Sequence, residues 1–310
     1  MEINNILVSS GIYDEIKDII EKKNINKQFK YLPENEVTKE HLSWADAFVS
    51  FRPSPSFSFE NIKWVHSIGA GVDGFLYNKE WKEDVLLTRT VCSFGQRISE
   101  YCLSYILRDI QLHRKFQRLQ TEKKWTPIAP KLLNEQKVII YGTGVIGQEV
   151  GQLLTSLGLE VYGVSQSGKQ KDGFHSVLTI DNEFSVLKEM NYVINTLPLT
   201  AETEGLFNKK RFNHFSRAVF INIGRGQSVE ETALIDALDN KDVKSAVLDV
   251  FPEEPLPVES QLWEREDVFI TPHISAVTTP EEAVDCFIET LEKIEKGEPL
   301  SNKVDVKKGF

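Results

Sequence analysis

Three polar side chains in the second half of the chain, Arg225, Glu254 and His273, have the chemistry needed to reduce a keto group. Each follows an apolar stretch of strand type, and ligands of parallel α/β sheets bind at the carboxyl ends of the strands. A guanidinium can hold a carboxylate through two hydrogen bonds, and an imidazole can deliver a proton near neutral pH. A carboxylate beside that imidazole favours its charged form. This set suits hydride transfer to a 2-oxo acid.

A glycine-rich turn predicts the site of a dinucleotide. The pattern GxGxxG is formed by Gly142, Thr143, Gly144, Val145, Ile146 and Gly147. It follows an apolar strand pattern at 138–141 and precedes a helical pattern at 148–157, which is the context that the motif requires. The first glycine permits the tight turn, the second admits a pyrophosphate, and the third lets helix and strand pack closely. The beginning of the helix would then face the phosphates.

The loop after the next strand, at 161–164, favours NADP over NAD. An acidic residue that would bind the ribose 2′-hydroxyl is missing there. The loop instead offers Ser165, Gln166, Ser167 and Lys169, with Lys171 two residues further on. Hydroxyl groups can donate to a 2′-phosphate and a lysine can neutralise it, whereas a carboxylate would repel it. NAD stays open as the alternative cofactor.

Short apolar strands alternate with helical patterns along the whole chain, which is typical of parallel sheets covered by helices on both faces. The first set of expected strands lies at 6–8, 47–49, 64–66 and 86–88, and the second set continues with 192–195, 219–222, 246–249 and 268–270. A helix at about 98–119, with Tyr101 and Tyr105 among its apolar residues, is expected to join the two sets. The fold class predicted is α/β with two domains.

Composition excludes several classes of function. A chain of 310 residues with a formal net charge of −10 is a poor partner for nucleic acid or an anionic membrane. Three cysteines without CxxC spacing indicate neither a disulfide framework nor a zinc site, and no signal peptide or apolar span is visible. We therefore expect a cytoplasmic protein that binds no metal. GxSxG and HExxH are absent, which argues against a hydrolase elbow and a metalloprotease.

Together these motifs resemble the D-isomer-specific 2-hydroxyacid dehydrogenase family. The matching segments are 142–147, 197–205, 221–226, 248–257 and 271–275, and residues 69–73 are similar to the family's loop for the substrate carboxylate. The resemblance implies that Arg225 binds substrate, that His273 is the acid and base, and that Glu254 supports it. The resemblance also implies that the cofactor is bound by Leu197, Pro198, Thr203, Ile223, Gly224 and Asp249, and that the substrate is bound by Gly69, Ala70, Gly71 and Arg52.

The same resemblance implies a Rossmann-like NAD(P)-binding domain, residues 97–276, inserted into a flavodoxin-like substrate domain, residues 1–96 and 277–310. The active site would lie between these domains, and the long helix would support a homodimer. The 165–169 loop and residues 273–278 are most similar to the glyoxylate/hydroxypyruvate reductase A branch.

We therefore expect NAD(P)H-dependent reduction of a small 2-oxo acid of the glyoxylate or hydroxypyruvate kind to the D-2-hydroxy acid. Two alternatives are a dinucleotide-sensing binding protein of this fold and an enzyme like D-3-phosphoglycerate dehydrogenase. The catalytic set argues against a sensor, which needs no acid. The chain carries glutamate at position 254, where the formate dehydrogenase branch has glutamine.

Overall fold

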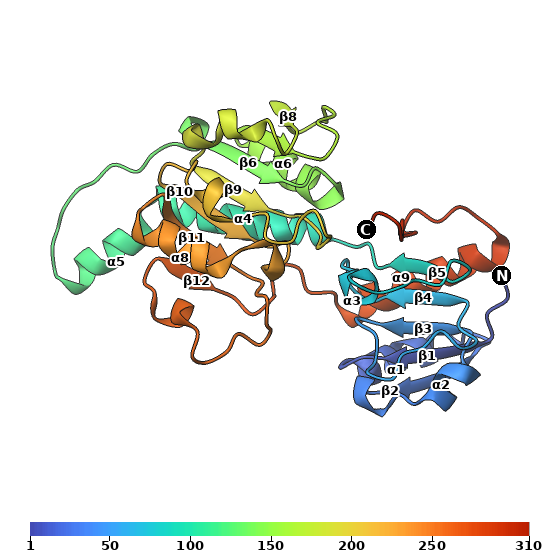
Figure 1. The fold of residues 1–310 in the computed structure, drawn as a ribbon. Coiled ribbons are helices and arrows are strands. Elements are labelled where there is room, and N and C mark those ends of the chain that lie inside the picture. The colour runs from blue at the N-terminus through green and yellow to red at the C-terminus, as the bar shows by residue number, and fades with distance from the viewer. Residues whose placement is uncertain (310) are drawn as a thin grey trace. The chain divides into compact units, whose positions relative to one another are not determined.

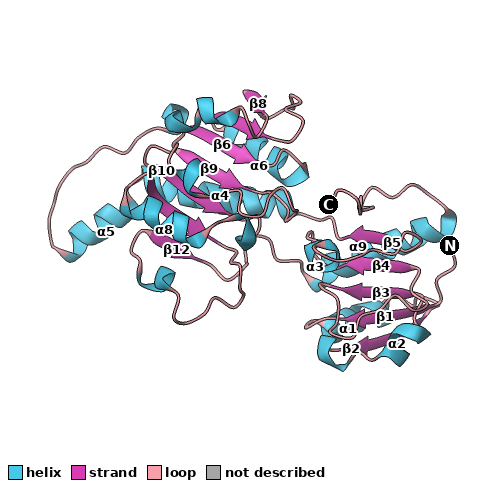
Figure 2. Cartoon of the chain, viewed as in Figure 1, coloured by secondary structure: helices cyan, strands magenta, loops and turns pink. Residues whose placement is uncertain are grey.

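The computed structural model describes residues 1–309, which form two compact units, each built on one parallel sheet. Unit 1 contains Met1–Cys92 and the segment from Thr278 onward, and unit 2 contains Ser93–Val277. Both units contain helices as well as strands (Figure 2). The prediction of an α/β fold with two domains is therefore confirmed.

Unit 1 has a five-stranded sheet in the order β2-β1-β3-β4-β5, which is the flavodoxin-like order. Its elements are β1 (Asn5–Ser9), α1 (Tyr13–Lys22), β2 (Gln28–Leu32), α2 (Lys39–Trp44), β3 (Ala47–Ser50), β4 (Trp64–Ser67), α3 (Asp73–Leu76), β5 (Leu86–Arg89) and α9 (Pro280–Lys296). Helices α1 and α9 pack on one face, where the Trp64 and Phe287 rings stack, and α2 and α3 pack on the other. The C-terminal helix thus completes the core that the first strands begin.

Unit 2 has a seven-stranded sheet in the order β12-β11-β10-β9-β6-β7-β8, a Rossmann-like order extended by one strand (Figure 1). Its strands are β6 (Lys137–Tyr141), β7 (Glu160–Val164), β8 (Ser176–Leu178), β9 (Tyr192–Asn195), β10 (Ala218–Asn222), β11 (Val243–Leu248) and β12 (Val268–Ile270). Its helices are α4 (Phe94–Ile110), α5 (His113–Thr121), α6 (Val145–Ser156), α7 (Lys209–Phe212) and α8 (Glu231–Asp239). Helices α4 and α6 cover one face and α7 and α8 the other, so the central strands are buried on both sides.

The prediction of one continuous helix over 98–119 is wrong. Helix α4 ends at Ile110, Leu112 takes a left-handed φ of 57°, and α5 begins at His113. Apolar spacing continues into α5, but α5 contains no buried residue, and it stands away from the sheet of unit 2 (Figure 1). The two apolar residues of α5 do not enter the core of unit 2, because Phe116 is exposed and Leu119 is only partly buried.

Sequence reasoning also missed the two edge strands β2 and β8. Strand β2 has no fully buried residue, and β8 is only three residues long. Neither offers the continuous apolar run that a central parallel strand shows.

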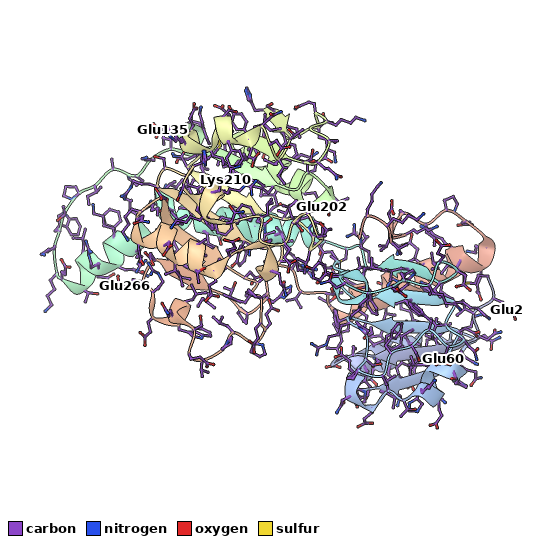
Figure 3. All side chains as sticks on the ribbon, viewed as in Figure 1. Glu2, Glu60, Glu135, Glu202, Lys210 and Glu266 are labelled. Atoms are coloured by element: carbon purple, nitrogen blue, oxygen red, sulfur yellow. The ribbon has the colours of Figure 1, made fainter. Side chains whose placement is uncertain are left out.

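Most charged side chains lie at the surface, as Glu60 and Glu266, labelled in Figure 3, illustrate, whereas Asp249, Glu183 and Arg211 are buried. Within residues 1–309, no helix has both the length and the apolarity that crossing a membrane requires.

Candidate active site

The turn that carries His273 is held by one buried carboxylate. Asp249 follows β11 directly and is fully buried. Its Oδ1 accepts hydrogen bonds from the Thr271 hydroxyl at 2.6 Å and from the Ile274 N–H at 2.8 Å, and its Oδ2 accepts from the Ser275 N–H at 2.9 Å. The His273 N–H donates to the Asp249 carbonyl at 2.9 Å, and His273 has a left-handed φ of 54°. Asp249 therefore fixes the backbone on both sides of His273.

Glu254 and His273 form a pair at the carboxyl edge of the sheet. His273 Nδ1 and Glu254 Oε2 lie 2.8 Å apart, and Glu254 Oε1 accepts from the Phe251 N–H at 2.9 Å. Because an ionised carboxylate only accepts, Nδ1 must carry the proton that it donates, which leaves Nε2 for a substrate. The side chains of His273 and Glu254 are 50% and 37% exposed, so the imidazole is reachable from solvent.

The pair sets the direction of both pKa values. The hydrogen bond to Glu254 raises the pKa of His273, against the opposing effects of partial burial and of the Arg225 charge. Partial burial would raise the pKa of Glu254, but the hydrogen bonds from His273 and the Phe251 N–H outweigh it and lower that pKa. The arrangement therefore favours an imidazolium beside a carboxylate.

Arg225 lies after β10 on a loop with a fixed backbone. The Arg225 carbonyl accepts hydrogen bonds from the Ser228 hydroxyl at 2.6 Å and from the Asn222 side-chain amide at 3.1 Å. The adjacent Gly226 packs so closely on the loop of Glu254 that a Cβ there would lie 1.9 Å from the Phe251 carbonyl carbon. The positive charge of Arg225 contributes to the lowered pKa of Glu254 and opposes the rise in the pKa of His273. The structure thus brings the three predicted residues together within electrostatic range.

The glycine turn has room for a phosphate at one defined position. Gly142 has a φ of +98°, and a Cβ at Gly147 would lie 1.9 Å from the Gly142 carbonyl oxygen, so both glycines are required by the protein itself. A Cβ at Gly144 would instead meet no atom within 4 Å. Helix α6 begins at the next residue, and no side chain caps it. Its first N–H groups are therefore available to an anion, as a dinucleotide pyrophosphate requires.

The loop after β7 is tied to this turn. Lys171 Nζ donates to the Thr143 carbonyl. The hydroxyl oxygens of Ser165 and Ser167 accept from the N–H groups of Gly168, at 3.1 Å, and Lys169, at 3.3 Å. Both hydroxyl hydrogens are then left to donate, while Gln166 and Lys169 are exposed beside them. This polar loop fits a 2′-phosphate next to the glycine turn.

The remaining predicted cofactor residues lie on loops that two buried asparagines hold. Asn195 Nδ2 donates to Asn222 Oδ1 at 2.8 Å, and the asparagines' Oδ1 atoms accept from the N–H groups of Leu197, at 3.1 Å, and Gly224, at 3.2 Å. The Thr203 hydroxyl donates to the Pro198 carbonyl at 2.7 Å, and Ile223 is buried. Sequence reasoning missed the asparagine pair, although a buried asparagine at the end of each of two neighbouring strands is a visible signal.

The predicted substrate residues of unit 1 lie at the carboxyl ends of β3 and β4. Gly69, Ala70 and Gly71 follow β4, where Arg89 donates to the Ala70 carbonyl at 3.1 Å. Within residues 1–309, the backbone N–H groups of Ala70 and Gly71 have no hydrogen-bond partner, which suits a carboxylate. Arg52 follows β3, but its Nε is 2.7 Å from Glu34 Oε2, so this guanidinium is already engaged by a carboxylate.

Comparison with known proteins confirms the family that the sequence motifs indicated. Residues 103–275 match the model of the D-isomer specific 2-hydroxyacid dehydrogenase NAD-binding domain. A glyoxylate/hydroxypyruvate reductase A from Serratia proteamaculans is 35% identical over 256 residues, which covers 80% of this chain and 82% of that protein.

Two solved structures are similar over nearly the whole chain. One is a D-isomer specific 2-hydroxyacid dehydrogenase from Xanthobacter autotrophicus in complex with NADPH and MES, with 30% identity, a TM-score of 0.89 and full coverage of both chains. The other is an NADPH-dependent glyoxylate/hydroxypyruvate reductase from Sinorhizobium meliloti in complex with NADP and sulfate, with 29% identity and a TM-score of 0.89 over 99% of this chain and 100% of that one.

Proposed function

Because the chain belongs to the D-isomer specific 2-hydroxyacid dehydrogenase family, we propose that it reduces a small 2-oxo acid of the glyoxylate or hydroxypyruvate class to the D-2-hydroxy acid, with NADPH as the donor. The observation that carries this proposal is the Glu254–His273 pair at 2.8 Å, with the Arg225 charge beside it. The relatives named for this reduction, and the NADPH-dependent enzyme among the similar structures, support the substrate class and the cofactor.

In the proposed mechanism, NADPH would be held by the glycine turn, Gly142 to Gly147, and when bound would supply the hydride for the keto carbon. Arg225 binds the substrate carboxylate and keto oxygen and stabilises the charge that develops there. His273 donates the Nε2 proton to the alkoxide and becomes neutral, while Glu254 holds the tautomer with the proton on Nδ1. Asp249 keeps the turn in place through its hydrogen bonds to Thr271, Ile274 and Ser275, and its full burial weakens the case for the direct cofactor contact that the resemblance implied.

We assign cofactor binding to unit 2 and substrate-carboxylate binding to residues 69–71 of unit 1. The glycine turn would hold the pyrophosphate and the loop of Ser165, Ser167 and Lys169 the 2′-phosphate. The hydroxyls and lysine of this loop, together with the absence of a carboxylate, support NADP as the preferred cofactor, with NAD as the weaker one. The predicted role of Arg52 in substrate binding has less support, because its guanidinium already forms an ion pair with Glu34.

We further propose a homodimer formed through α5 and the loop that follows it. Helix α5 buries none of its residues within its own unit, and Trp125 in the loop is 99% exposed. Phe116 of α5 and Trp125 are large apolar side chains that this segment exposes, and a second copy of the chain would remove both from water. Light scattering of the protein and of Trp125→Ser tests the dimer, which the substitution should weaken.

No disulfide joins the cysteines of residues 1–309, which suits a cytoplasmic location.

The activity is tested by following NADPH absorbance with glyoxylate, hydroxypyruvate, pyruvate and branched 2-oxo acids, and by repeating each assay with NADH. We expect glyoxylate and hydroxypyruvate to be reduced fastest, and we expect the rate with NADPH to exceed the rate with NADH. His273→Asn should lose turnover while it still binds NADPH. A wild-type protein that binds NADPH but reduces none of these acids would point to a dinucleotide sensor instead.

A further inference from the structure

Tyr101 is a residue of α4 whose hydroxyl reaches the turn of His273. Its oxygen lies 2.7 Å from the Thr271 hydroxyl oxygen, and Thr271 lies 2.6 Å from Asp249 Oδ1. The Thr271 proton must point to Asp249, because the carboxylate cannot donate. Thr271 can therefore only accept from Tyr101. The direction of each hydrogen bond is thus fixed: Tyr101 donates to Thr271, and Thr271 donates to Asp249.

Packing keeps the Tyr101 ring at this position. The rings of Tyr101 and Tyr105 lie 5.0 Å apart, and Tyr105 lies 5.9 Å from the Phe269 ring on β12. Burial raises the pKa of Tyr101, so its hydroxyl stays protonated and remains a donor. The phenol is partly buried, where a hydrogen bond is less exposed to competing water.

We propose that Tyr101 and Thr271 are positioning residues for the proposed reduction, which act through Asp249 to hold His273 against Glu254. A hydrogen-bonded chain polarises each of its members, so donation by Tyr101 makes Thr271 a stronger donor to Asp249. Asp249 in turn fixes the N–H groups of Ile274 and Ser275 just after the imidazole. The proposal rests on the proposed function for its kinetic effect, but its effect on the imidazole can be measured without turnover.

The kinetic test uses isosteric variants and a matched control. Tyr101→Phe should lower kcat/KM for the 2-oxo acid about five-fold, the equivalent of ~1 kcal/mol, and leave the KM for NADPH within about two-fold. Thr271→Val should lower kcat/KM further than Tyr101→Phe does, whereas Thr271→Ser, which keeps the hydroxyl, should have kcat/KM close to that of the wild type. Tyr192→Phe is the control, because its hydroxyl donates to Asp109 at 3.0 Å at the opposite end of the strands. This control should keep the wild-type rate.

Two further readouts separate positioning from general damage to the fold. The double variant Tyr101→Phe, Thr271→Val should be no slower than Thr271→Val alone, because Tyr101 acts only through Thr271. The charged groups that face His273 are Glu254, Arg225 and Asp249, and the hydrogen bond to Glu254 is the one that raises its pKa most. If Tyr101 helps to hold the imidazole against Glu254, its loss weakens that hydrogen bond. An NMR titration of His273 in the protein without substrate, assigned with His273→Asn, should therefore give a lower pKa in Tyr101→Phe than in the wild type and no change in Tyr192→Phe.

A Tyr101→Phe variant with wild-type kcat/KM and a wild-type His273 titration would overturn the proposal, as would losses that simply multiply in the double variant. If the wild-type protein reduced no 2-oxo acid, the proposed function would fail. The NMR titration would still decide whether Tyr101 positions the imidazole.

Discussion

The glycine turn offers a sharp test because two of its glycines face different surroundings. A Cβ at Gly147 would collide with the Gly142 carbonyl oxygen at 1.9 Å, whereas a Cβ at Gly144 would meet nothing within 4 Å. The φ of −71° at Gly144 suits alanine. Alanine at each position in turn therefore separates a contact within the protein from a contact with a ligand.

The expected magnitudes differ in kind. Gly147→Ala must displace backbone, and overpacking of this sort costs about 1–3 kcal/mol. At roughly 2–4 °C per kcal/mol for a domain of this size, its Tm should fall by about 2–12 °C. Gly144→Ala loses only a favourable N-cap glycine, which costs about 0.5–1 kcal/mol. Its methyl group would occupy the space that a pyrophosphate needs, so the Kd for NADPH should rise at least about ten-fold, or ~1.4 kcal/mol.

Thermal unfolding without ligand and fluorescence titration with NADPH measure the two effects independently. The wild-type Tm should rise with NADPH, and that rise should shrink for Gly144→Ala. The reasoning is refuted if Gly144→Ala binds NADPH as the wild type does, or if it destabilises the ligand-free protein as much as Gly147→Ala.

Three further predictions concern the catalytic set and the cofactor loop. Glu254→Gln removes the charge that raises the pKa of His273, so kcat/KM for reduction, which needs the protonated imidazole, should begin to fall at a lower pH; an unmoved pH profile would contradict this. Arg225→Lys keeps the charge but loses the planar fork, and kcat/KM should drop by about 100-fold, with a smaller change in the NADPH Kd measured by titration. Ser165→Asp places a carboxylate where we expect the 2′-phosphate, so the ratio of NADPH to NADH activity should fall about ten-fold or more; an unchanged ratio would exclude this loop from the cofactor site.

Much of the fold could be predicted from the sequence, because buried parallel strands appear there as continuous apolar runs. The strands at 192–195 and 268–270 were predicted with the bounds that the structure gives them. Since each polar candidate lies in the loop that follows such a strand, the strand also places the candidate at the carboxyl edge of the sheet, as for Arg225 after β10. The roles of these residues in catalysis stay predictions until they are assayed.

Other features depended on contacts that no local pattern reveals. Helix periodicity continues through Leu112, so the break between α4 and α5 was not visible in the sequence. The spacing of Tyr101 predicts an apolar helix position, yet its hydroxyl forms a hydrogen bond with Thr271, which is 170 residues away along the chain. Strand β8 depends on pairing with β7, since its own three residues carry too little apolar pattern.

The left-handed backbone of His273 means that this residue serves two purposes with separate parts. Its side chain is suited to proton transfer, while its main chain takes a conformation that costs an L-residue about 1–2 kcal/mol and a glycine almost nothing. Glycine there would relieve that cost and would lose a partly exposed ion pair worth about 0–1 kcal/mol. Thermal stability alone would therefore not select for histidine at this position, and a relative that had lost its chemistry could drift to glycine or asparagine without unfolding.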